Sequence, residues 1–130
     1  MKKHHDQLWE ITLPDDWEVE ADEDSVSLYH PDGPGTIQVS ATRQEEGIRE
    51  EDLREMAADH LEAGAELEEV ELGDFDGFVL RYDTEGEYWC EWYLKAEDRL
   101  LFVTYACALE EEGEEEDLVE AVLDTLVLHD

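Results

Sequence analysis

Hydrophobic and polar residues alternate along most of the chain. Alternation with a period of two is typical of a β-strand that is buried on one face. It predicts strands at about 8–13, 17–20, 25–30, 36–42, 66–72, 77–83, 87–95 and 99–109. Because consecutive strands joined by short turns pair antiparallel, we expect one antiparallel sheet.

Two segments have helical spacing instead. Residues 49–64 have a stripe formed by Leu53, Met56, Ala57, His60 and Leu61, with Gly64 as the stop signal. Residues 114–128 have a second stripe, with acidic residues in the first turn, formed by Leu118, Val119, Val122, Leu123 and Leu126. The predicted fold class is α+β: an antiparallel sheet of about six or seven strands with packed helices, an α/β/α sandwich. No repeat or linker divides residues 1–130, which indicates a single domain.

Two glycine-containing stretches raise the question of ligand binding. In Pro31-Asp32-Gly33-Pro34-Gly35 the glycines lead into a strand, whereas a phosphate-binding loop leads into a helix and has a basic residue nearby. We interpret this stretch as a hairpin turn. Asp74-Phe75-Asp76-Gly77 has strands on both sides and lacks the spacing of a calcium-binding EF-hand loop, so it is also predicted to be a turn.

The charge balance is extreme, with 40 acidic and 8 basic residues and a net charge of −32. Such a surface disfavours nucleic acid and anionic membranes, which are bound by clustered lysine and arginine. Two explanations compete: adaptation to high salt, or mimicry of an acidic ligand by an inhibitor of a basic enzyme. Residues 1–65 carry a net charge of −13 and residues 66–130 carry −19. This spread favours salt adaptation.

The sequence offers no constellation typical of an enzyme. The histidines His4, His5, His30, His60 and His129 have no metal-ligand spacing, and Cys90 and Cys107 form no CxxC motif. We expect His60 to be a hydrogen-bonded core residue and both cysteines to be buried thiols. No catalytic, cofactor-binding or metal-binding residue is predicted, and no cavity equipped with converging ionisable groups is expected. The start of the chain lacks the apolar stretch of a signal peptide, which favours a cytoplasmic location.

The segment EYWCEWYLK at residues 87–95 is the most unusual local feature. In a strand, its side chains divide into two faces. One face is expected in the core and consists of Tyr88, Cys90, Trp92 and Leu94. The other face is formed by Trp89, Glu91, Tyr93 and Lys95 and suits either a rim beneath a helix or a surface for a partner. Trp89 and Tyr93 are therefore the candidate protein-binding residues.

Short motifs along most of the chain resemble the bacterial Mog/PsbP-like fold family. In the first part they are Leu13, Pro14, Trp17, Tyr29, Pro31, Gly35 and Ser40. They continue with a helix, a strand that begins at Gly77-Phe78, a tryptophan-rich strand, the apolar segment VTYAC and a terminal helix. The resemblance implies an antiparallel sheet of six or seven strands with helices on its faces. It implies no particular activity, because relatives range from an import factor to a photosystem subunit and secretion chaperones.

The expected function is therefore that of a small, acidic, non-enzymatic protein-binding or chaperone-like domain from a halophilic or salt-tolerant organism. An unknown protein is the expected partner. The alternative is an acidic inhibitor or immunity protein that neutralises a basic toxin or nuclease.

Overall fold

The protein was analysed as a computed structural model. The structure describes residues 2–5, 8–23, 25–31, 33, 35–44, 47, 49–111, 113 and 116–128. Along the chain, its elements are β1 Lys2–His5, β2 Trp9–Leu13, β3 Glu18–Ala21, β4 Val26–Tyr29, β5 Gly35–Arg43, α1 Glu50–Met56, α2 Ala58–Glu62, β6 Glu66–Leu72, β7 Phe75–Thr84, β8 Glu87–Ala96, β9 Arg99–Ala108, the 3-10 helix Leu109–Glu111, α3 Glu116–Leu123 and β10 Val127–Leu128.

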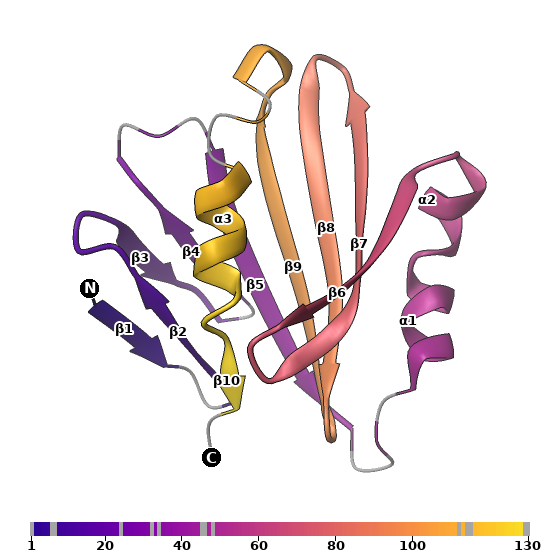
Figure 1. Cartoon of the computed structure of the whole chain (residues 1–130), viewed down its shortest axis with the longest axis horizontal. Helices are drawn as coiled ribbons and strands as arrows, with labels where there is room; N and C mark the ends of the chain where they lie inside the picture. Colours follow the sequence, from indigo (N-terminus) through magenta and orange to yellow (C-terminus); the bar gives the residue numbers. More distant parts are fainter. Residues whose placement is uncertain are drawn as a thin grey trace.

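The predicted α+β fold class is confirmed. Seven strands form one antiparallel sheet in the order β3-β4-β5-β9-β8-β7-β6 (Figure 1). A second sheet has the order β1-β2-β10. The expectation of one sheet needs correction here, because β2, predicted as the strand at 8–13, pairs with the two ends of the described chain rather than with the large sheet.

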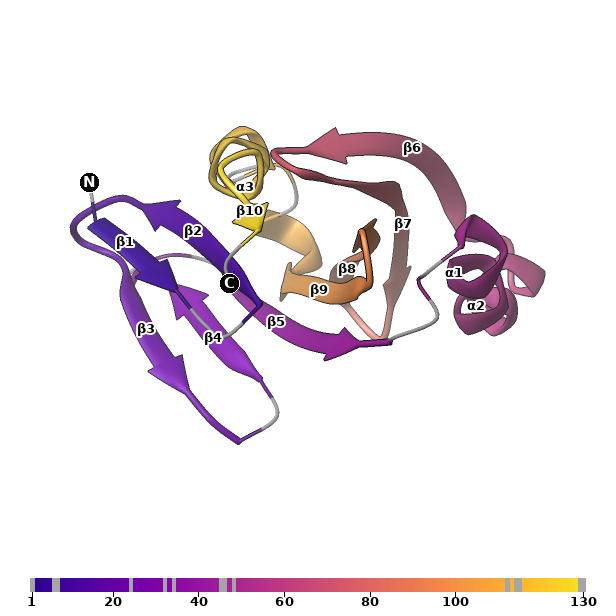
Figure 2. The ribbon, with the colours of Figure 1, turned by 90° about the horizontal axis from the view of Figure 1, so that it is seen from below.

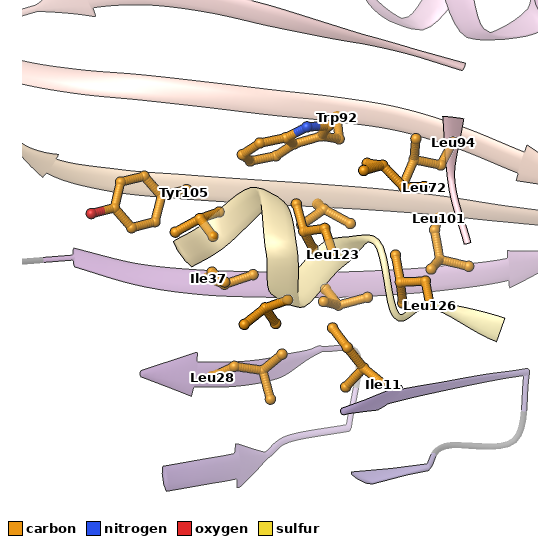
Figure 3. Packing of buried hydrophobic residues seen from close by; sticks show 14 of the residues in the cluster. Ile11, Leu28, Ile37, Leu72, Trp92, Leu94, Leu101, Tyr105, Leu123 and Leu126 are labelled. Carbon is orange, nitrogen blue, oxygen red and sulfur yellow. The ribbon is translucent and has the colours of Figure 1, made fainter. Parts of the chain in front are cut away.

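Helices lie on both faces of the seven-stranded sheet. We call these the α3 face and the α1 face, after the helix that packs on each. Seen from below in Figure 2, α3 and β10 lie on one side, and α1 and α2 lie at the far end of the other side. The main hydrophobic core fills the space between the α3 face, α3 and β2 (Figure 3). Leu123, Leu126 and Ile11 are each fully buried in it.

A smaller cluster lies under α1. Leu53 and Ala57 are fully buried there against Phe78 and Leu80 of β7. At the start of α1, the side chain of Asp52 accepts a hydrogen bond of 3.0 Å from the backbone N–H of Arg49, which satisfies a donor at the helix end. The predicted helix at 49–64 is interrupted at Ala57, and Met56, expected on its buried stripe, is 49% exposed.

The turn between β6 and β7 is fixed to the segment that follows α3. The backbone N–H of Asp74 donates to the carbonyl of Leu126 at 2.8 Å, and the N–H of Leu128 donates to the carboxylate of Asp74 at 3.0 Å. Gly73, at φ +62°, approaches Leu126 so closely that an added Cβ would lie 1.7 Å from its carbonyl oxygen. The predicted turn at 74–77 needs correction, because the hairpin turns at Gly73 and Asp74, and Phe75, Asp76 and Gly77 already pair with β6 as part of β7.

Other local predictions had mixed outcomes. The terminal helix ends at Leu123, earlier than predicted, and Leu118 of its expected stripe is 41% exposed. β4 and β5 pair antiparallel, as a hairpin requires, although Asp32 and Pro34 of the connecting turn lie outside the described residues, as does His129. His4, with no predicted element, lies in β1.

Candidate functional site

Three adjacent strands of the seven-stranded sheet carry no acidic residue. These are β4, β5 and β9, in a chain in which 40 of 130 residues are Asp or Glu. Every other strand of that sheet, and each of α1, α2 and α3, contains acidic residues. The interior-facing side chains of the three strands belong to the main core, so their opposite side chains lie on the α1 face.

Much of the α1 face is not covered by a helix. Among the described residues, α1 packs near β7 and the adjoining part of β8, and Figure 2 shows no helix over β5 and β9. We call this uncovered region the acid-free face. It consists of Ser27, Tyr29, Thr36, Gln38, Ser40, Thr104, Ala106 and Trp89, and its edge toward α1 is formed by Phe102, which packs against the cluster under that helix. Gln38 is exposed and the others are partly exposed, so these side chains meet solvent.

One row of the acid-free face combines large and small side chains. By strand register, Tyr29 lies beside Thr36, Thr36 beside Ala106, and Ala106 beside Trp89. Cross-strand neighbours have Cβ atoms about 5 Å apart, so Trp89 stands between Ala106 and Tyr82, and Thr36 lies one strand beyond Ala106. The row therefore places aromatic side chains on both sides of two small residues.

Carboxylates lie at the border of the acid-free face. Glu18 and Glu20 of β3 are the register partners of Tyr29 and Ser27. The hydroxyl of Tyr29 donates to Glu20 at 2.8 Å, and this hydrogen bond is the main cause that raises the pKa of Tyr29 to about 12. An uncharged centre with a charged rim is the usual anatomy of a protein interface.

The two candidate binding residues have different surroundings. Tyr93 is 3% exposed and packs against the rings of Phe78 at 5.2 Å and Phe102 at 5.1 Å, next to α1. It offers no surface to a partner while α1 is in place, so its proposed direct contact needs correction: Tyr93 belongs to the helix-covered rim. Trp89 is partly exposed and remains the candidate contact. The opposite face of β8, from Tyr88 to Leu94, lies in the main core as predicted.

Glu91 is a buried carboxylate between these two residues. It is 6% exposed and accepts hydrogen bonds from the hydroxyls of Tyr82 at 2.8 Å and Tyr93 at 2.9 Å. Nε2 of His60 lies 3.2 Å from the same carboxylate, and its ring stacks on Tyr82 with centroids 4.9 Å apart. Burial, reinforced by the Glu91 hydrogen bonds, raises the pKa of Tyr82 and Tyr93 well above the ordinary value. The cluster joins α2 to the sheet.

His60 is less buried than expected. Its side chain is 39% exposed. It nevertheless lies within hydrogen-bonding distance of Glu91, as expected of a hydrogen-bonded core histidine. Cys90 and Cys107 are both buried, as expected, and Cys107 is the register partner of Tyr88, which places it diagonally from Cys90. In the part of the chain that the structure describes, no group of three or more His, Cys, Asp or Glu side chains is placed to hold a metal ion.

An open groove of about 1120 Å³ lies beside the end of β7, next to the start of β6 at Glu66. Arg81 lies in its wall, and its guanidinium nitrogens are close to three carboxylates. Nη1 is 3.3 Å from Oε2 of Glu68, Nε is 3.5 Å from Oε1 of Glu116, and Nη2 is 3.4 Å from Oε1 of Glu120. His60 and Tyr82 also line it. The expectation that no cavity contains converging ionisable groups is therefore wrong. The lining of the groove comes from α2, β6, β7, β8 and α3, and the sequence has no local signal for bringing these elements together.

Comparisons with known proteins inform the fold. No family model matches the chain, and no curated protein matches it. Three solved structures are similar. A protein of Bacteroides thetaiotaomicron VPI-5482 has a TM-score of 0.71 and 21% identity over 99% of this chain, which spans 48% of the other. LpqN of Mycobacterium tuberculosis, involved in cell envelope biogenesis, has a TM-score of 0.62 and 16% identity, with coverage of 94% and 83%.

The third similar structure is that of PsbP (CyanoP) from the cyanobacterium Synechocystis sp. PCC 6803. It has a TM-score of 0.52 and 10% identity, with coverage of 98% of this chain and 92% of the other. The chain has a PsbP-like fold. At these identities the likeness concerns the fold alone. Within the described residues, the PsbP-like domain has no helix of the length and apolarity needed to cross a bilayer.

Proposed function

We propose that this PsbP-like chain is a non-enzymatic protein-binding or chaperone-like domain that docks a polypeptide through the acid-free face. The observation that supports this proposal is the difference in acidic residues. β4, β5 and β9 carry none, whereas every other strand of the seven-stranded sheet and each of α1, α2 and α3 carries at least one. A carboxylate buried at an interface must lose its hydration, so neutral surfaces associate at lower cost. Trp89 adds a large aromatic side chain, a residue type enriched among those that dominate binding energy.

We further propose that the chain belongs to the bacterial Mog/PsbP-like family and works in the cytoplasm of a halophilic or salt-tolerant organism. The support for the salt-rich setting is the net charge of −32. At about 1 M salt the screening length falls to about 3 Å, so repulsion between surface carboxylates largely disappears. In such a setting an acid-rich surface remains hydrated, and an uncharged region stands out as a place for contact.

Site-specific photocrosslinking tests the proposed function. A photoreactive phenylalanine is placed at Thr104, in the middle of the acid-free face, and the protein is irradiated in a high-salt lysate of its source cells. The matched control carries the same group at Leu118, which is 41% exposed on α3 between acidic residues. We expect a polypeptide adduct from position 104 that is absent from position 118.

Two results would contradict this proposal. One is the absence of any polypeptide adduct from position 104. The other is an adduct with a basic enzyme from position 118 alone, which would support the alternative of an acidic inhibitor.

A further inference from the structure

β7 extends further along the sheet than its neighbour β6 (Figure 1). The pairing between the two strands begins with Glu66 opposite Arg81. Within the described residues, no strand therefore pairs with residues 82–84 on the side away from β8, although β8 pairs with all three of them on its own side. A strand edge of this kind presents backbone N–H and C=O groups that pair with an added strand.

The open groove of about 1120 Å³ lies along this unpaired edge. Residues 82–84 line it, and the last two of them are exposed. Residues 63–66 and two acidic residues of α3, Glu116 and Glu120, form other parts of its lining. Because neighbouring strands lie about 4.8 Å apart, a segment paired with β7 at this point would occupy the groove. Sites for small ligands have volumes of roughly 300–1000 Å³, so the groove has room for a short peptide segment.

The lining of the groove differs between the two faces of the sheet. Arg81 contacts Glu116 and Glu120 of α3, so it lies on the α3 face. Side chains of a strand alternate, which places Asp83 on the same face and Tyr82 on the α1 face. The groove contains the guanidinium of Arg81 and five carboxylates, those of Glu66, Glu68, Asp83, Glu116 and Glu120. The stacked rings of Tyr82 and His60 line it from the α1 side.

This difference defines the chemistry of a segment that fits. The side chains of an added strand also alternate between the two faces. Those on the α3 side meet an excess of carboxylates, which favours lysine or arginine. Those on the α1 side meet the rings of Tyr82 and His60, against which uncharged side chains pack. Backbone pairing thus supplies affinity, and the alternating side chains supply specificity.

We infer that the groove is a docking site for an extended segment of another polypeptide, which pairs with residues 82–84 as an added strand and carries a basic residue at every second position. This inference goes beyond the proposed function and does not rest on it, because residues 82–84 are not part of the acid-free face. The bare acidity of the surface attracts any cation, whereas this site also requires backbone N–H groups on one edge of the segment.

Fluorescence anisotropy with a labelled peptide of alternating lysine and threonine tests the inference on the purified full chain. About 0.5 M KCl screens the general attraction to the acidic surface. Two further forms of the peptide are N-methylated, one at every lysine and the other at every threonine. Because N–H groups of successive strand residues point to opposite edges, only one form blocks the edge that pairs with β7. We expect that form to bind at least about tenfold more weakly and the other to bind within about threefold of the unmodified peptide.

A matched pair of variants locates the binding. Glu66→Gln with Asp83→Asn removes two exposed carboxylates from the groove, neither of which contacts Arg81 in a listed ion pair of the sheet. This double variant should bind the unmodified peptide at least about fivefold more weakly. Glu18→Gln with Glu23→Gln removes the same charge at and beside β3, the opposite edge strand, and should change binding by less than about twofold. Circular dichroism checks that both variants are folded.

The outcomes separate the inference from the proposed function. No binding of the unmodified peptide, equal binding of all three peptide forms, or equal effects of the two folded double variants would each overturn the inference. Crosslinking from position 104 tests the acid-free face independently. If the peptide binds as expected and position 104 gives no adduct, the inference stands and the proposed function falls. If the peptide fails and position 104 gives a polypeptide adduct, the proposed function stands and the inference falls.

Discussion

Trp89 of β8 is the direct cross-strand neighbour of Ala106 of β9. The largest side chain of the acid-free face thus stands beside one of its smallest, on a sheet whose three neighbouring strands β4, β5 and β9 contain no Asp or Glu. The same register places Tyr93 four residues further along β8, on the same face but beneath α1. The boundary of the helix cover therefore falls between the two aromatic residues. It leaves Trp89 accessible at the surface and buries Tyr93.

The helix cover can be tested through two neighbouring residues of α1. Leu53 is fully buried against β7, whereas Met56 is 49% exposed. Leu53→Ala leaves a cavity and should lower the free energy of unfolding by about 2–5 kcal/mol. Met56→Ala should change it by less than about 0.5 kcal/mol. Urea denaturation in high salt measures both. Equal effects of the two substitutions would show that α1 packs on the sheet in a different rotation.

The contact between the β6–β7 turn and α3 makes a second prediction. Gly73→Ala would place a methyl group 1.7 Å from the backbone carbonyl oxygen of Leu126, so one of the two segments must move. We expect a loss of about 3 kcal/mol or more in the free energy of unfolding. Gly64 also has a positive φ, +93°, but an added Cβ meets nothing within 4 Å. Gly64→Ala is the matched control and should cost about 1 kcal/mol. A mild effect at Gly73 would contradict the described contact.

The tyrosines around Glu91 predict how stability depends on pH. Tyr82 and Tyr93 have pKa values raised by burial and by their hydrogen bonds to Glu91. The folded chain therefore keeps phenol protons that the unfolded chain releases above its ordinary pKa of about 10. Stability from these groups is fully present below that pH and declines as the pH rises above it. Denaturation midpoints and phenolate absorbance, measured together from about pH 8 to 11, check this expectation.

A matched pair of variants assigns that effect to the Glu91 cluster. Tyr93→Phe removes a hydrogen bond to a buried carboxylate and should cost about 1.5–3 kcal/mol at neutral pH. Tyr29→Phe removes a hydrogen bond at the border of the acid-free face, where Glu20 remains hydrated, and should cost much less. Phenolate absorbance that appears at the ordinary pH in the folded protein, with no loss of stability, would count against the described hydrogen bonds.

The acidic surface predicts a strong effect of salt on thermal stability. Self-repulsion at a net charge of −32 should destabilise the folded chain at low ionic strength. We expect the melting temperature to rise by several degrees or more between about 0.1 and 2 M KCl, because each kcal/mol gained raises it by roughly 4 °C. The measurement uses potassium chloride and not a sulfate salt, because sulfate stabilises most folded proteins by exclusion from their surface. Its effect would therefore not report the screening of charge. A flat or falling curve would remove the explanation by salt adaptation.

The sequence predicts the strands and their faces well where the pattern is local. The alternation in EYWCEWYLK places Tyr88 and Trp92 in the main core and Trp89 on the other face, because side chains of a strand alternate strictly. Features that depend on distant pairing are missed. β1 consists of two lysines and two histidines, with no apolar pattern, and forms by pairing with β2. β10 is too short to show a period.

The candidate site could be predicted only in part. The absence of acids from β4, β5 and β9 is visible in the sequence, but its meaning requires the sheet order, which brings two strands about sixty residues apart side by side. Tyr93 is misassigned because periodicity shows which face a residue lies on and not how far a helix extends over that face. Likewise, the apolar spacing of 49–64 places Met56 on the buried stripe, whereas α1 buries Leu53 and Ala57 and leaves Met56 49% exposed beside them.

Quenching of tryptophan fluorescence tests the central claim most directly, because the other three tryptophans, Trp9, Trp17 and Trp92, are at most 3% exposed. Acrylamide should therefore reach mainly Trp89. In about 2 M KCl, we expect the quenching constant of the purified protein to be clearly higher than that of the Trp89→Phe variant, because Trp89 lies on the part of the α1 face that no helix covers. The Leu118→Glu variant should behave like the unmodified protein. A quenching constant that Trp89→Phe leaves unchanged would contradict the account.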